Sequence, residues 1–116
     1  MTYMNQDMTT TEKAMGMAGQ IYLPYNSPVN VPAHFVAVAP KTNQSESTLA
    51  VQNLSNTFEA TFTINPNPPG HRPVVTIPAN DRTPRYFTHN WNGARLAVSN
   101  VSQESAAIQV SLYGQA

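Results

Sequence analysis

The chain has 116 residues, with six basic and six acidic side chains, a formal net charge of zero and no cysteine. A chain of this length forms one domain with a core of its own. The lack of cysteine excludes disulfide cross-links and thiolate chemistry. Charged residues make up only 10% of the chain, far below the roughly 25% of typical domains, so the polar surface is mainly uncharged. Copies of such a chain repel one another weakly, which favours self-association.

The first 20 residues have a composition of their own. All five methionines lie here, and no proline does. Methionine is flexible and fills irregular apolar grooves well, and the segment is compatible with either a short helix or an extended strand. We therefore predict an N-terminal arm, residues 1–20, that docks on a neighbouring subunit. The residues expected to make this contact are Tyr3, Met4, Met8, Met15, Met17, Ile21, Tyr22 and Leu23.

The sequence contains no apolar run near the ~20 residues that a membrane span needs. Its first residues lack the basic start and apolar stretch of a secretory signal. We expect no membrane span. If the protein is a self-associating surface protein, we expect it to be extracellular or on the surface of a cell, spore or virion. It would reach this location without a recognisable signal peptide.

Residues 21–116 have the pattern of a single β domain. All ten prolines lie between Pro24 and Pro84, which excludes long helices there. Apolar and polar side chains alternate over 58–64 and over 106–112, which predicts strands with one buried face. We expect a loop at 66–70 and a tight turn at Asn92-Gly93. The predicted core residues are Phe58, Phe62, Ile64, Leu96, Val98, Ile108, Val110 and Leu112, and the predicted outward-facing residues are Glu59, Thr61 and Thr63.

Seven or eight short strands separated by turn residues predict an all-β fold, an antiparallel jelly-roll-like β-sandwich of about eight strands with an N-terminal extension. A repeat supports this fold. Residues 49–55, Leu-Ala-Val-Gln-Asn-Leu-Ser, match residues 96–102, Leu-Ala-Val-Ser-Asn-Val-Ser. Each copy is followed by a polar turn and an alternating strand, so we predict one hairpin used twice, as in a double Greek key.

The residue pattern contains no recognisable catalytic, cofactor or metal site. His34, His71 and His89 lack the i, i+4 spacing of zinc ligands. The six carboxylates suggest no facing pair, and Asp81 and Arg82 are expected to form a local ion pair in a turn. We therefore predict a protein that is not an enzyme and needs no cofactor.

One segment, residues 71–95, combines four arginines with aromatic side chains and a single acid. This combination suits protein interfaces, glycans or nucleic acids. Because the whole chain is neutral and four arginines make no continuous basic face, we expect no nucleic acid partner. The residues proposed for an interface or glycan contact are Arg85, Tyr86, Asn90, Trp91 and Asn92.

The layout resembles the small jelly-roll subunits of bacterial endospore appendages, the Ena family. The similar parts are the arm at 1–20, the strand end at 49–53, the Pro-Ala-Asn-Asp segment at 78–81 and the closing strand at 107–113. The resemblance implies a flexible connector before an eight-stranded jelly roll, in a homopolymer. Well-known members cross-link through connector cysteines, which this chain lacks, so cohesion would come from added strands and apolar packing.

These observations predict a structural, self-assembling subunit of an extracellular filament, pilus-like fibre or coat. Its polymer would be non-covalent, with the arm of one copy docked on the next. Two alternatives share the same fold and composition. One is a carbohydrate-binding, lectin-like module that recognises a surface glycan, and the other is a structural protein of a phage or virion.

Overall fold

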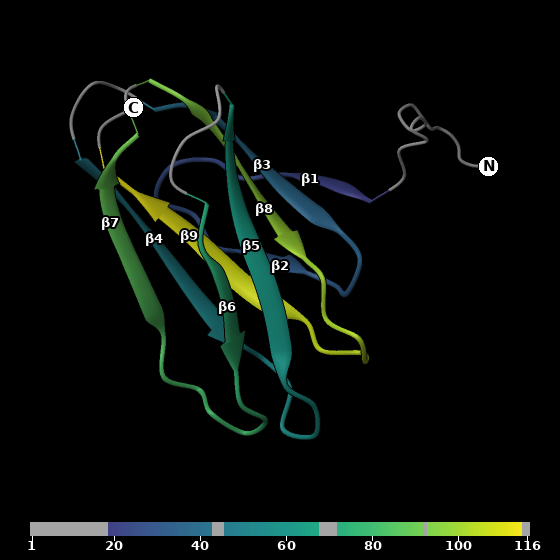
Figure 1. The fold of residues 1–116 in the computed structure, drawn as a ribbon. Coiled ribbons are helices and arrows are strands. Elements are labelled where there is room, and N and C mark those ends of the chain that lie inside the picture. Colours follow the sequence, from purple (N-terminus) through teal and green to yellow (C-terminus); the bar gives the residue numbers. More distant parts are fainter. Residues whose placement is uncertain (1–18, 43–45, 68–71, 92, 115–116) are drawn as a thin grey trace.

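The computed structural model describes residues 19–42, 46–67, 72–91 and 93–114. Every regular element in these ranges is a β-strand (Figure 1). None of the described segments forms a helix of the length and apolarity that crossing a membrane requires. The strands are β1 (Gln20–Tyr22), β2 (Val29–Val31), β3 (Val36–Lys41), β4 (Glu46–Asn53), β5 (Ala60–Asn67), β6 (Val74–Ile77), β7 (Arg85–Asn90), β8 (Arg95–Asn100) and β9 (Ile108–Tyr113).

The strands form two sheets with the core between them. The five-stranded sheet has the order β1-β3-β8-β5-β6, and the four-stranded sheet has the order β2-β9-β4-β7. Four antiparallel strand pairs are nested in sequence, so that each pair lies within the preceding one. They are β2 with β9, β3 with β8, β4 with β7, and β5 with β6. A long hairpin wrapped around one core in this way is a jelly roll. The predicted fold class is therefore confirmed, with β1 as an additional strand.

The additional strand β1 lies at an edge of the five-stranded sheet, parallel to β3 (Figure 1). Directly after it, the backbone N–H of Leu23 donates to the carbonyl of Val38 at 2.9 Å. Tyr25 then forms a bridge to Leu112 of the four-stranded sheet. Residues 20–25 thus pass from one sheet to the other and close this side of the sandwich.

The core is built from the inward-facing side chains of both sheets, as the alternation predicts. Seven of the eight predicted core residues are buried. They are Phe62, Ile64, Leu96, Val98, Ile108, Val110 and Leu112. Thr61 and Thr63 lie half-buried on the opposite face of β5, and Glu59 is exposed. The predicted register of this strand is therefore confirmed.

Phe58 is the exception, because 37% of its surface remains exposed. The prediction extended the strand back to residue 58, but β5 begins at Ala60. Phe58 lies in the turn before it, where its N–H donates to the Ser55 hydroxyl at 2.9 Å. Its ring is thus placed by a turn rather than by the alternation of a strand.

The repeated segments do not form the predicted hairpins. β4 and β5 belong to different sheets, and so do β8 and β9. Each repeat therefore carries the chain across the sandwich as an arch: the first arch is residues 54–59 and the second arch is residues 101–107. The arches interlock, because β4 pairs with β9 while β5 pairs with β8. The registers differ, because Asn53 lies opposite Ile108, the first residue of β9, whereas Asn100 lies opposite Phe62, the third residue of β5.

A buried asparagine stands at the start of each arch. Asn53 and Asn100 are fully or almost fully buried. The side-chain oxygen of each accepts an N–H two residues later, from Ser55 at 2.9 Å and from Ser102 at 3.1 Å. The amide of Asn53 donates to the carbonyls of Phe58, Ile77 and Pro78, and the amide of Asn100 donates to those of Val31 and Ala106. The conserved spacing within the repeat is therefore explained by the need to satisfy backbone groups at a buried corner.

The loop predicted at 66–70 begins later than expected, because β5 continues through Pro66 to Asn67. Ile64 donates its N–H toward β6, to the carbonyl of Pro73. Alternate residues of a strand direct their N–H groups to the same side, so the missing N–H of Pro66 falls on the β6 side. Its pairing with Leu96 of β8 is unaffected, which is why proline is tolerated here.

Candidate interaction surfaces

The connection between β6 and β7 holds an ion pair, although not the predicted one. Arg85 Nη2 lies 2.9 Å from Asp81 Oδ2, and the N–H of Thr83 donates to Asp81 Oδ1 at 3.0 Å. The bond from Arg85, followed by that from Thr83, lowers the pKa of the Asp81 carboxyl below its ordinary value. The guanidinium of Arg82 instead donates to Asn56 Oδ1 at 3.1 Å. The expected Asp81–Arg82 pair is therefore wrong.

Trp91 was expected at a surface contact, but only 4% of it is exposed and it packs in the core. Its indole Nε1 donates to the carbonyl of Ser47 at 3.4 Å. The ring of His89 meets it edge to face, with ring centroids 4.8 Å apart. A buried tryptophan with a hydrogen-bonded N–H has a packing role. The proposed contact through Trp91 is therefore corrected.

The other proposed contact residues have different surroundings. Tyr86 is 65% exposed, and Asn90 is exposed at the end of β7. Arg85 is half-buried and held by Asp81. Asn92 lies outside the described residues, as does half of the predicted Asn92-Gly93 turn. The structure thus brings together Tyr86 and Asn90 on one face of β7, and it separates them from Trp91.

The proposed arm contacts fall largely before the described part of the chain. Ile21 and Tyr22 lie in β1, with Tyr22 65% exposed. Leu23 is fully buried in the core of its own sandwich, so its expected contact with a neighbouring subunit is corrected. The residues outside the described ranges are Tyr3, Met4, Met8, Met15 and Met17.

Strand β6 is an uncharged edge of the five-stranded sheet. It pairs with β5 alone, and Val74 is 69% exposed. Because Ile64 donates to Pro73 on the side facing β5, the alternation of an antiparallel ladder directs the backbone groups of Val74 and Thr76 away from the sheet. Pro73 and Pro78 flank the strand. The edge therefore offers backbone donors and acceptors beside an exposed valine.

The residue pattern indicated a strand at 74–77 but not its edge position. A signal was present, because prolines on both sides of a short strand are typical of an edge. No charged residue interrupts Val74–Ile77, whereas natural edge strands usually carry one to prevent pairing between molecules. The prediction missed this site because edge position depends on which strands pair.

A shallow groove of about 430 Å³ borders β1 at the opposite edge of the same sheet. Tyr22, Val38 and Pro40 form part of its wall, and the exposed Arg95 lies on its border. The groove forms where β1 ends while β3 continues to Lys41. Most of its lining residues are apolar, and Gln20 and Arg95 are the polar ones.

The described histidines form no metal centre. His34 has a φ of 71° in a turn closed by the N–H of Phe35 on the carbonyl of Pro32 at 3.0 Å. It borders a hollow of about 350 Å³ together with Glu104. Across the described ranges, no group of three or more His, Cys, Asp or Glu side chains is placed to hold an ion.

Comparisons with known proteins support the fold. No family model matches the chain, and no curated protein sequence matches it. Among solved structures, the pre-peptidase C-terminal domain of a collagenase from Bacillus anthracis is similar, with a TM-score of 0.53 and 11% identity. The match covers 80% of this chain and 93% of that domain. At this identity the likeness concerns the β-rich fold alone.

Proposed function

We propose that this protein is a non-catalytic structural subunit that assembles non-covalently with copies of itself into an extracellular filament, pilus-like fibre or coat. In this assembly the N-terminal arm of one copy adds to the sheet of its neighbour. The observation that carries the proposal is the β6 edge. Val74 and outward backbone groups are exposed there, and none of the residues Val74–Ile77 is charged. Such an edge is a template for a strand from another chain.

The positions of β1 and β6 suit an open assembly. They lie at opposite edges of the same sheet, and the arm leads directly into β1. A contact between the arm of one copy and β6 of the next joins two different surfaces. Contacts of this head-to-tail kind build filaments unless the rotation between copies closes a ring.

The arm is long enough for this contact. Eighteen residues precede Gly19, and a fully extended chain of that length spans about 60 Å. The described domain measures 40 × 31 × 23 Å. An extended arm can therefore reach across a whole neighbouring subunit to its far edge.

The test compares the full-length chain with three variants by negative-stain electron microscopy and light scattering. We expect fibres or sheets from the full-length protein. Deletion of residues 1–18 and the substitution Val74→Lys should each give folded monomers. Val74 has no polar side-chain group to lose, so the lysine adds a charge to the edge at little cost to the fold.

The control is Gln103→Lys, which adds the same charge to the exposed second arch, away from β6. We expect this variant to assemble like the unchanged protein. Uniform monomers from the unchanged protein would contradict self-assembly. Polymers that persist after both the deletion and Val74→Lys would exclude the arm and the β6 edge as the contact.

A further inference from the structure

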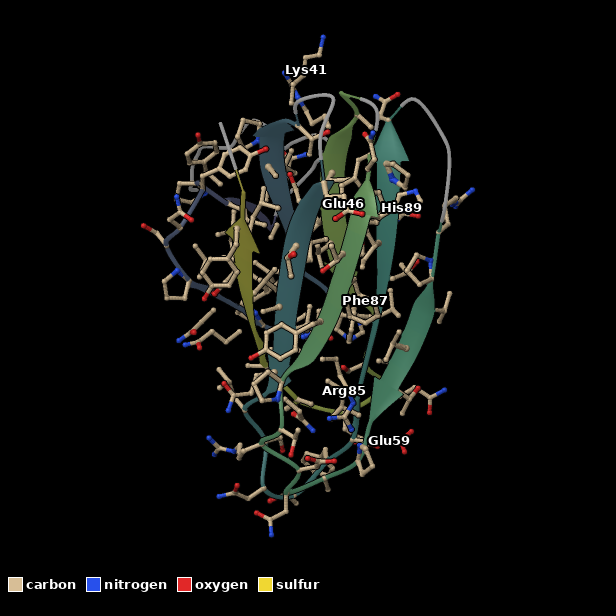
Figure 2. The ribbon with its side chains drawn as sticks, turned by 90° about the vertical axis from the view of Figure 1, so that its left-hand side faces the viewer. Lys41, Glu46, Glu59, Arg85, Phe87 and His89 are labelled. Carbon is tan, nitrogen blue, oxygen red and sulfur yellow. The ribbon has the colours of Figure 1, made fainter. Side chains whose placement is uncertain are left out.

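The outer face of the four-stranded sheet carries a second surface, away from both edges of the other sheet. Figure 2 looks toward this sheet, with β4 and β7 side by side and Glu46 near one end. Outward side chains from neighbouring strands form rows across it. One row is Ser111, Ala50 and Tyr86. The next row is Tyr113, Thr48 and Thr88.

The two rows place tyrosines at opposite corners of a floor of small side chains. Tyr86 is 65% exposed and Tyr113 is 45% exposed. They belong to β7 and β9, on either side of β4, and are offset by one row. From the strand spacing and the rise per residue, the corners lie about 12 Å apart. Two rings therefore border a strip of small side chains, of which Ser111 is buried, with 6% of its surface exposed.

The floor and its border are polar but almost uncharged. The hydroxyls of Thr48 and Thr88 lie 2.8 Å apart and hydrogen-bond to each other. The row on the other side of Ser111, Ala50 and Tyr86 contains amides. There Gln109 Nε2 donates to Asn30 Oδ1 at 3.3 Å, and Gln52 Nε2 donates to the carbonyl of Arg82 at 2.8 Å. These bonds hold the amides in place, while their side-chain oxygens keep further acceptor capacity.

The strands of this face carry little charge, although Arg82 lies beside Gln52 at the end away from Glu46. Among the outward strand residues of the four-stranded sheet, Glu46 is the one ionisable carboxylate or cation. A nucleic acid or a charged peptide would find no complementary charge there. A neutral polyhydroxylated ligand loses no ionic hydration on binding, and its hydroxyls match amides and threonine hydroxyls.

We propose that this face binds a neutral oligosaccharide, with sugar rings stacked on Tyr86 and Tyr113 and hydroxyls directed to Gln52, Gln109 and Asn30. The flat apolar side of a pyranose ring stacks on an aromatic ring, and tyrosine adds a polar hydroxyl at its tip. The inference goes beyond self-assembly, because it assigns a ligand to a face that the proposed arm contact does not use.

The outer face of the five-stranded sheet provides the comparison. Tyr22 there is also 65% exposed. Its neighbours in the row are Val38, Ala97 and, beyond them, Asn65. The side chains directly beside Tyr22 are aliphatic, and its exposure equals that of Tyr86, which makes Tyr22 a matched control.

The test is affinity electrophoresis of the full-length chain carrying Val74→Lys, which should be monomeric and enter a native gel. The gels contain hydroxyethyl cellulose, mannan or dextran, with polygalacturonate as the anionic comparator. We expect at least one neutral polysaccharide to retard the protein, and polygalacturonate not to do so. Tyr86→Ala and Tyr113→Ala should each weaken binding about ten-fold, which corresponds to about 1.4 kcal/mol. Tyr86→Phe, which keeps the ring, should retain most of the binding.

Tyr22→Ala should bind like the unchanged protein, and thermal unfolding should show that all four variants fold. Absence of retardation in every neutral gel would overturn the proposal. An equal loss from Tyr22→Ala and Tyr86→Ala would also overturn it. The use of Val74→Lys separates the two proposals, because this protein should stay monomeric in light scattering and still bind the polysaccharide.

Discussion

The two arches have the same local sequence, but different structures support them. In the second arch the amide of Asn100 donates to the carbonyls of Val31 and Ala106 at 2.9 and 2.8 Å, both buried. In the first arch the amide of Asn53 has three acceptors, the carbonyls of Phe58, Ile77 and Pro78, and the bonds to Phe58 and Pro78 are only partly buried.

The serines of the two arches differ in the same way. Ser102 is 1% exposed, and its hydroxyl accepts the N–H of Thr61 in β5 at 2.9 Å. Ser55 is less buried, and its hydroxyl accepts N–H groups within its own turn, from Thr57 and Phe58. The comparison shows that one local motif can either join strands of the core or organise a surface turn. The surroundings decide which role it takes.

The largest expected effect compares the residues opposite the two asparagines. Phe62 lies opposite Asn100, and Ile108 lies opposite Asn53. Both are fully buried, and the ring of Phe62 also meets Phe87 edge to face at 5.8 Å. Phe62→Ala should lower the free energy of unfolding by about 3–5 kcal/mol, and Ile108→Ala by somewhat less. Urea denaturation measures both, and a loss below about 2 kcal/mol for Phe62→Ala would contradict its central position.

A smaller effect is expected at the asparagines themselves. Asn100→Ala leaves buried carbonyls without donors and should cost about 2–3 kcal/mol. Asn53→Ala should cost about 1–2 kcal/mol, because water can reach two of its three acceptors. Urea denaturation of the two variants under the same conditions gives the difference. If Asn53→Ala proves the more costly, the two arches do not differ in burial as described.

The smallest expected effect is a pH dependence beside the first arch, where the N–H of Asn80 donates to the carbonyl of Ser55 at 3.0 Å. The pKa of Asp81 is lowered from its ordinary value of 3.8, first by the hydrogen bond from Arg85. A group with a lowered folded pKa stabilises the fold above its unfolded pKa, and this contribution is lost as the pH falls through the folded pKa.

Asp81→Asn should therefore make the loss of stability below about pH 4 slightly less steep, while a change at pH 7 stays small because the pair is at the surface. Thermal unfolding between pH 2 and 7 measures this dependence. Identical pH profiles for the unchanged protein and Asp81→Asn would contradict a role for the carboxylate.

The candidate surfaces were only partly predictable. Tyr86 and Trp91 were proposed together as interface or glycan contacts, but Tyr86 is exposed on β7 whereas Trp91 is buried. Its indole instead finds the carbonyl of Ser47, 44 residues away in sequence. The edge position of β6 and the proximity of Tyr113 to Tyr86 also arise from strand pairing. No local pattern contains that information.

The sequence by itself determined the all-β class, the inward face of β5, β8 and β9, and the positions of the two repeats. These features follow from side-chain alternation and turn residues within a few positions of one another. Only the tertiary structure decided that the repeats are arches rather than hairpins. The reason is physical: pairing between β4 and β9 and between β5 and β8, which are distant in sequence, directs each following strand into the other sheet.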